Sequence, residues 1–282
     1  MNELLRVDDL VVRYGALTAV DGVSLSIRAG EVVALVGESG CGKSSTARAV
    51  VGMEKPAEGS VHFRETPVPP LGLRRRTAEL TAIQMVFQDP NSSLNPRKRV
   101  GEQITDGVRA AQARGLGSAE PGAWLEAVGL EAGMTSRYPH QFSGGQRQRI
   151  AIARALAAKP DLIVADEPIS ALDASSQASV AAMMRRLCLE AGAGMLFISH
   201  DLSVVRLMAD RVMVMYRGSV VESGPTPLVW SDPAHPYTQA LLAAIPHPDG
   251  RGVLPAAPAA EAPEEWTSRL PEALDRHERT SA

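Results

Sequence analysis

The sequence predicts an α/β fold in which a mostly parallel sheet is covered by helices, and three observations indicate it. Strand-like apolar runs alternate with helical ones in the second half of the chain, which is typical of parallel sheets. A glycine-rich turn joins a Val-rich strand to a helix near residue 40. The chain has 282 residues, of which 45% are hydrophobic, so it can bury a sizeable core. We therefore expect one large domain over residues 1–245.

The N-terminal residues predict a small sheet that leads into a buried strand. Val-rich, partly alternating runs cover Leu4–Tyr14 and Val23–Ile27, and glycines separate them, as is typical of strands and turns. The next run, Val32–Val36, is continuously apolar, as expected of a strand that is buried on both faces. Helical spacing then predicts a helix over Lys43–Val51 that ends at Gly52.

The middle of the chain predicts a helical lobe inserted into the α/β domain. Apolar residues recur at intervals of three or four between Arg97 and Gly129, which is the period of an amphipathic helix. With the helix that ends near Ala158, the lobe is expected to span about residues 93–158. The strands and helices predicted beyond it are Leu162–Ala165, Ser175–Glu190, Met195–Ile198, a helix from Leu202, and Val212–Tyr216.

The residues after Ile245 have a different composition. Prolines are set among alanines and charged residues, and large apolar side chains are few. Such a segment lacks the apolar surface that would offset the entropy of ordering a chain. We therefore expect a mostly disordered tail over residues 246–282.

Composition excludes several classes of protein. The formal net charge of −3 calls for neither nucleic acid nor an anionic membrane surface as a partner. No apolar run approaches the roughly 18 residues of a spanning helix, and the N-terminus lacks the features of a secretion signal. The two cysteines, Cys41 and Cys188, are far apart, which argues against a disulfide framework or a structural zinc. We expect a cytoplasmic chain with reduced thiols, of which Cys188 serves packing.

A phosphate-binding loop is predicted directly after the strand that ends at Val36. The segment Gly37–Ser44 fits the pattern GxxxxGK[ST], whose glycines and helix N-terminus present N–H groups to an anion. We expect Lys43 to reach the β- and γ-phosphates and Ser44 to ligate Mg²⁺. A tolerated small side chain is favoured at Cys41 over a thiol of lowered pKa. The residues predicted to contact the nucleotide here are Gly37, Ser39, Gly40, Cys41, Gly42, Lys43, Ser44 and Ser45.

Two later strands end in polar side chains. Asp166 and Glu167 follow Leu162–Ala165, at the edge where a parallel sheet presents side chains to a ligand. With a phosphate loop upstream, Asp166 is expected to hold the Mg²⁺ shell and Glu167 to orient or deprotonate an attacking water. His200 follows the next strand, Met195–Ile198, and is the candidate contact to the γ-phosphate. This division of roles indicates ATP hydrolysis rather than binding alone.

The segment Ser143–Gln146 opens the helix that ends near Ala158. Its serine caps the helix, and its two glycines expose N–H groups at the N-terminus as a second anion site. This segment matches the signature of ABC-type ATPases, and the chain resembles that family over about residues 3–245. In the family, two cassettes meet head to tail, and the signature of one closes on the γ-phosphate held by the other. The residues so implied are Ser143, Gly144, Gly145 and Gln146.

The resemblance implies a P-loop NTPase (ABC ATPase) fold with a mostly parallel core sheet, an N-terminal antiparallel β subdomain and an inserted helical subdomain. Tyr14 resembles the aromatic residue that stacks on adenine, Gln88 the lid glutamine, and Asp173 the loop at the dimer interface. ATP and Mg²⁺ are the implied cofactors. The metal ligands are expected to be Ser44, Gln88 and Asp166, and the catalytic residues Glu167, His200 and Gln88.

Two further stretches, Phe87–Arg97 and His235–Leu242, resemble the oligopeptide, dipeptide and nickel importers of this family. That resemblance implies a second, paralogous ATPase subunit, two membrane permease subunits and, indirectly, an extracytoplasmic solute-binding protein, with no nucleic acid bound. The expected location is the cytoplasmic face of the cell membrane. Many relatives carry a cysteine-rich C-terminal extension, and nothing like it follows Ile245, so no metal cluster is implied here.

Two other functions are alternatives to that of a transporter subunit. A soluble ABC ATPase that acts on DNA or ribosomes usually carries long coiled-coil insertions or two cassettes in one chain, and neither is visible in the sequence. A small-molecule P-loop kinase would share Lys43 and Ser44. It would have no use for Ser143–Gln146 or for Glu167.

Overall fold

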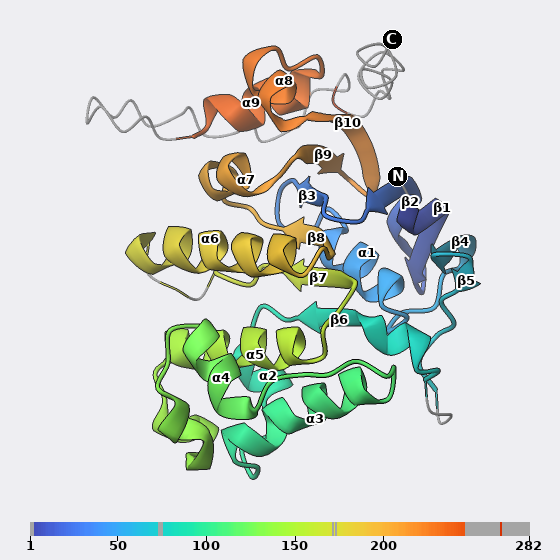
Figure 1. The fold of residues 1–282 in the computed structure, drawn as a ribbon. Coiled ribbons are helices and arrows are strands. Elements are labelled where there is room, and N and C mark those ends of the chain that lie inside the picture. Colours follow the sequence, from blue (N-terminus) through green and yellow to red (C-terminus); the bar gives the residue numbers. More distant parts are fainter. Residues whose placement is uncertain (1–2, 73–75, 171, 173, 246–265, 267–282) are drawn as a thin grey trace.

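The computed structural model describes residues 3–72, 76–170, 172, 174–245 and 266. These residues form two sheets flanked by helices, so the predicted α/β fold is confirmed (Figure 1). The expectation of a disordered tail falls on residues 246–282, which lie outside the described part of the chain except for Trp266.

The first sheet is the small antiparallel one expected at the N-terminus. Its four strands are β1 (Glu3–Tyr14), β2 (Leu17–Arg28), β4 (Glu58–Phe63) and β5 (Thr66–Pro67), in the order β2-β1-β4-β5. The pairs β1–β2, β1–β4 and β4–β5 are all antiparallel. Strand β2 is longer than the predicted Val23–Ile27 because its exposed first residues pair with the end of β1.

The second sheet is mostly parallel and forms the centre of the molecule. Its six strands are β3 (Val32–Val36), β6 (Ile83–Val86), β7 (Leu162–Asp166), β8 (Gly194–Ile198), β9 (Arg211–Tyr216) and β10 (Ser219–Pro225). Their order is β10-β9-β3-β8-β7-β6, and all neighbours are parallel except β9 and β10. Strands β3, β8 and β7 are therefore adjacent, and their carboxyl ends meet at one edge.

Helices follow most strands, and one group of them is inserted between β6 and β7. In Figure 1 this group lies below the central sheet. Its members are α2 (Pro90–Ser93), α3 (Val100–Gln112), α4 (Pro121–Ala127), η2 (Ala132–Ser136), η3 (Pro139–Gln141) and α5 (Gly144–Ala157). The remaining helices are α1 (Lys43–Val50), η1 (Glu79–Ala82), α6 (Ala174–Glu190), α7 (Leu202–Met208), α8 (Thr226–Ser231) and α9 (Pro236–Ala243).

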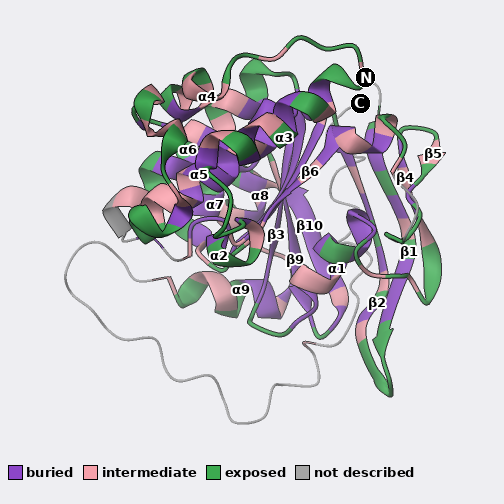
Figure 2. Ribbon diagram, turned by 90° about the horizontal axis from the view of Figure 1, so that it is seen from below, coloured by how far each residue is buried: buried purple, intermediate pink, exposed green. Residues whose placement is uncertain are grey.

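The central sheet is buried on both faces, which explains the continuous apolar runs in its strands. Val32, Ala34 and Val36 belong to one core cluster, which includes residues of helices α3 to α7. Val33 and Leu35 belong to the other cluster, which includes the antiparallel sheet and α1. Figure 2 shows this arrangement as purple strands at the centre and green residues on the outer surfaces. The β3 strand is thus held rigidly just before the phosphate loop begins.

Within the described part of the chain, no helix combines the length and the apolar character that a bilayer crossing requires.

Candidate active site

An open cavity of about 520 Å³ lies at the carboxyl edge of the central sheet. The predicted site residues that line it are Tyr14, Ser39, Gly40, Gly42, Lys43, Ser44, Ser45, Gln88, Glu167 and His200. Leu17 and Ala19, at the start of β2, also line the cavity, and sequence analysis missed them. No pattern in the sequence distinguishes Leu17 from other apolar residues, although its side chain is 65% exposed in the structure.

Two glycines of the loop are required by its packing. Gly37 has a φ of 148°, and a Cβ there would lie 2.1 Å from the carbonyl oxygen of Met215. Gly42 has a φ of 109°, and a Cβ would lie 2.3 Å from the carbonyl oxygen of Ala19. Both contacts are with backbone atoms, which cannot move aside cheaply. The loop therefore passes too close to β9 and β2 for any side chain at these positions.

Lys43 is folded beneath the phosphate loop. Its side chain is only 4% exposed, and its ammonium group donates to the carbonyl oxygens of Gly37 at 2.8 Å and Glu38 at 2.7 Å. An ammonium group has three N–H donors, and both of these acceptors are neutral. The positive charge of Lys43 therefore has no carboxylate partner among the described residues and can act on an anion in the cavity.

Ser44, which lines the cavity, contacts Asp166, although the two residues lie far apart in the sequence. The Ser44 hydroxyl donates to the Asp166 carboxylate, with an O···O distance of 2.9 Å. Burial raises the pKa of Asp166, while the Ser44 hydrogen bond lowers it and neighbouring Glu167 raises it further. Two of the predicted metal ligands are thus adjacent, because β7 ends beside the first turn of α1.

Glu167 connects the two other predicted catalytic residues. Its carboxylate accepts a hydrogen bond from the Gln88 amide nitrogen at 2.8 Å and lies 3.3 Å from the His200 Nδ1. The Glu167 backbone has a φ of 45° and donates its N–H to the carbonyl oxygen of Ile198. A left-handed glutamate is uncommon, and such strain is concentrated at functional sites. The order β8-β7-β6 brings these three side chains together.

Tyr14 also lines the cavity. Its hydroxyl donates to Glu54 at 3.1 Å and is 3.4 Å from the Ser45 hydroxyl. The residue is 40% exposed, so one part of the ring remains accessible. An exposed ring at the edge of a phosphate site has the place and the shape to stack on a base.

The predicted signature segment does not line this cavity. Ser143 is the N-cap of α5: its hydroxyl accepts the Gln146 N–H, and the Gln146 side chain accepts the Ser143 N–H in return. Ser143 and Gly144 are exposed, and nothing lies within 4 Å of a Cβ built on Gly144. The N-terminus of α5 is therefore exposed to solvent. Asp173, the predicted interface residue, lies outside the described residues.

The two cysteines are both buried, which agrees with the packing role expected of Cys188 and with a small tolerated side chain at Cys41. Burial raises the pKa of Cys41, and the nearby Lys43 ammonium lowers it by less. The structure thus does not support a reactive thiol in the loop. Burial also raises the pKa of Cys188, to about 12.

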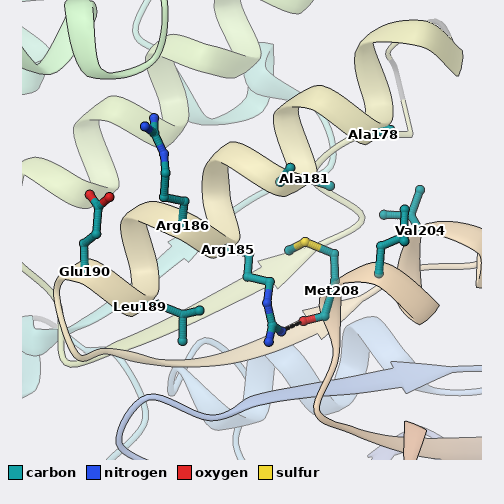
Figure 3. A pocket seen from close by; sticks show the side chains of 10 residues that line it. Ala178, Ala181, Arg185, Arg186, Leu189, Glu190, Val204 and Met208 are labelled. Atoms are coloured by element: carbon teal, nitrogen blue, oxygen red, sulfur yellow. Dashed lines mark hydrogen bonds between the residues drawn. The ribbon is translucent and has the colours of Figure 1, made fainter. Parts of the chain in front are cut away.

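A second cavity, of about 410 Å³, lies between α6 and α7 (Figure 3). Its lining is mainly apolar, with Leu189, Val204 and Met208 among its side chains. The Arg185 guanidinium beside it donates to the carbonyl oxygen of Met208 and to Asp210, so its charge is already compensated. Arg186 and Glu190 also line this cavity, but it has no glycine-rich loop of the kind that lines the first.

Two family models match the chain. One, described as ABC transporter, matches residues 20–170, which is more than half of the sequence. The other, described as oligopeptide/dipeptide transporter, C-terminal region, matches residues 221–268.

Similar proteins point to the same family. The chain is 48% identical to the putative oligopeptide transport ATP-binding protein YkfD of Bacillus subtilis over 257 residues, which cover 87% of this chain and 77% of the relative. It is 47% identical to the oligopeptide transport ATP-binding protein OppF of Escherichia coli over 236 residues, or 83% and 71% of the two chains. Among solved structures it resembles the ATP-binding cassette MJ0796, a dimer in a post-hydrolysis state with ADP and Pi, with a TM-score of 0.66 and 29% identity, over 79% of this chain and 99% of that one.

Proposed function

Since this chain belongs to the ABC transporter family, we propose that it is the ATP-hydrolysing subunit of an importer for oligopeptides, dipeptides or a related solute such as nickel. The observation that carries this proposal is the cavity in which the phosphate loop faces the group formed by Gln88, Glu167 and His200. This cavity combines the Lys43 ammonium group, which can bind phosphate, with the Glu167 carboxylate, which can accept a proton.

The loop is suited to hold the triphosphate. Residues 42–45, at the start of α1, line the cavity, and Lys43 supplies a positive charge there. Hydrogen bonds of an ammonium group to phosphate are stronger than those to neutral carbonyls. We therefore expect Lys43 to exchange at least one of its two carbonyl contacts for a phosphate oxygen when ATP binds.

The donor set around Ser44 and Asp166 fits Mg²⁺, which prefers oxygen ligands and binds with few protein groups beside substrate phosphates. No cluster of three or more His, Cys, Asp or Glu residues in the described part of the chain could hold a metal alone. Since the amide nitrogen of Gln88 is bonded to Glu167, the amide oxygen is the atom left to contact a metal. When bound, Mg²⁺ would neutralise charge on the β- and γ-phosphates.

We propose that Glu167 acts on the attacking water. The Gln88 amide and the His200 ring hold its carboxylate at the cavity wall, and the exposed side of His200 can contact a γ-phosphate oxygen. Glu167 would orient the attacking water and accept its proton while Lys43 balances the phosphate charge.

The exposed N-terminus of α5 supports the proposal that two ATPase subunits close on shared nucleotides. ATP binding shifts an equilibrium only by its difference in affinity for the open and closed states. A γ-phosphate contacted by one subunit's Lys43 and another's Ser143 segment would supply that difference. We propose a paralogous subunit as the partner, two membrane permeases that receive the motion, an extracytoplasmic binding protein that delivers the solute, and a location on the cytoplasmic face of the membrane.

A charge placed at the α5 N-terminus tests the shared site. Gly144→Asp is expected to leave ATP binding by the isolated chain unchanged, since this segment is outside the cavity, but to reduce phosphate release by the assembled complex at least about tenfold through repulsion of the partner's γ-phosphate. An acidic residue in the first turn is favourable for the helix itself, so folding should not suffer. The matched control is Gly133→Asp, also at an open glycine, which should retain turnover. Equal turnover in both variants would contradict a shared site.

Cell fractionation tests the transporter function against a soluble ATPase that acts on DNA or ribosomes. The relatives reported above are oligopeptide transport proteins, which weighs against the soluble alternative. The chain is expected to sediment with membranes when the permease subunits are co-expressed and to stay in the supernatant without them. Persistent association with nucleic acid or ribosomes under both conditions would contradict the proposal.

A further inference from the structure

Tyr237, in the first turn of α9, contacts the phosphate loop from the far end of the chain. Its phenol oxygen accepts a hydrogen bond from the Glu38 backbone N–H, with an N···O distance of 3.0 Å. Glu38 is the second residue of the loop, and Tyr237 is only 1% exposed. A residue outside the nucleotide cavity is therefore bonded directly to the backbone that cradles phosphate.

The bond fixes one particular peptide plane. The carbonyl of Gly37 and the N–H of Glu38 belong to the same planar peptide group and point in opposite directions. Lys43 donates to that carbonyl at 2.8 Å, while Tyr237 accepts from the N–H. If Lys43 turns toward a phosphate and leaves the Gly37 carbonyl, the hydrogen bond to Tyr237 is the one that still fixes the orientation of this peptide group. Gly37 has a φ of 148°, and because glycine is conformationally free, this peptide group could rotate without that hydrogen bond.

Two features position the Tyr237 ring. The backbone N–H of Tyr237 donates to the ring Nδ1 of His235, which is the N-cap of α9. The backbone N–H of His235 donates in turn to the fully buried carboxylate of Glu222. The Tyr237 ring also packs against Tyr216, with centroids 4.4 Å apart, and against Trp266, with centroids 5.3 Å apart. Trp266, which follows α9 in the sequence, therefore contacts the ring that is hydrogen-bonded to the loop.

Filling the core does not by itself explain a tyrosine at position 237. A phenylalanine would bury the same ring, and a buried hydroxyl lowers stability unless it is hydrogen-bonded. Burial raises the pKa of Tyr237, so the phenol stays neutral. Within the described residues, the Glu38 N–H is the partner of this hydroxyl.

We infer that Tyr237 is a positioning residue for ATP binding, which holds the Gly37–Glu38 peptide in its phosphate-binding orientation and is itself held by Trp266. The inference rests on the proposed function, because it concerns the same nucleotide site.

Tyr237→Phe tests the hydrogen bond while keeping the ring. The variant is expected to bind ATP about fivefold more weakly by calorimetry, with kcat of the assembled complex at saturating ATP within about twofold of wild type. The matched control is Tyr216→Phe, in the same ring cluster, whose hydroxyl has no hydrogen bond within the described residues. A purely structural role would lower the melting temperature of Tyr237→Phe, leave that of Tyr216→Phe near wild type, and leave the ATP affinity of both variants unchanged.

Amide hydrogen exchange gives a readout independent of turnover. The Glu38 amide should exchange at least about threefold faster in Tyr237→Phe than in wild type and should be unchanged in Tyr216→Phe, since only the first loses its acceptor. Trp266→Ala should also speed exchange of the Glu38 amide and weaken ATP binding, each by a smaller factor than Tyr237→Phe. Wild-type affinity and exchange in Tyr237→Phe would overturn this inference alone, whereas a wild-type chain that binds no ATP would overturn the proposed function as well.

Discussion

Glu167→Gln is expected to slow ATP hydrolysis by at least about 100-fold while ATP still binds. An amide has nearly the shape of the carboxylate and can still accept the Gln88 hydrogen bond through its oxygen. It cannot accept a proton from water, and it also removes the negative charge that faces His200. Phosphate release by the assembled complex measures the loss, and calorimetry with ATP measures the retained binding.

The control for this variant is Glu54→Gln. This substitution also replaces a carboxylate by an amide. Among the described residues, the Glu54 carboxylate accepts a hydrogen bond only from the Tyr14 hydroxyl. Turnover there should stay within about threefold of wild type. Near-normal turnover by Glu167→Gln would show that another group accepts the proton and would contradict the role proposed for this residue.

Gly37→Ala is expected to destabilise the chain by about 3 kcal/mol or more and to abolish measurable ATP binding. The new Cβ would lie 2.1 Å from the Met215 carbonyl oxygen, so either the loop or β9 must move. Movement of the loop would also displace the peptide that Lys43 and Tyr237 hold. Denaturant unfolding measures the stability, and calorimetry measures the binding.

Gly30→Ala separates steric overlap from backbone strain. Gly30 also has a positive φ, of 72°, but a Cβ there meets nothing within 4 Å. This variant should lose only about 1–2 kcal/mol and retain ATP binding. Similar losses of stability and binding in the two variants would show that positive φ, and not the contact with β9, makes Gly37 necessary.

The elements that sequence analysis identified share strong local signals. The helix predicted over Lys43–Val51 and the strand Val32–Val36 were found because the apolar period and the flanking glycines are both local. Strand β6 has only four residues, and β10 contains serine and glycine, so neither stands out by period. The place of β6 is decided by β7, which lies beyond the inserted helices, whereas β10 pairs with β9, the strand directly before it in the chain.

The candidate site divides in the same way. Local patterns predicted the loop, the acidic end of β7 and His200, since each is a short motif beside a strand. Leu17 was missed because an exposed apolar residue carries no pattern of its own. Tyr237 was noted only as part of a family-like stretch, since nothing near it in the sequence refers to Glu38.

The order of residues along the chain was enough to predict the α/β class, the phosphate loop and the ATPase chemistry, because these depend on spacing within segments shorter than about 20 residues. Only the folded structure decided that Ser44 meets Asp166, that Glu167 lies between Gln88 and His200, and that Tyr237 bonds to the loop. Those contacts depend on strand order and on packing between distant segments, and no short stretch of sequence determines either.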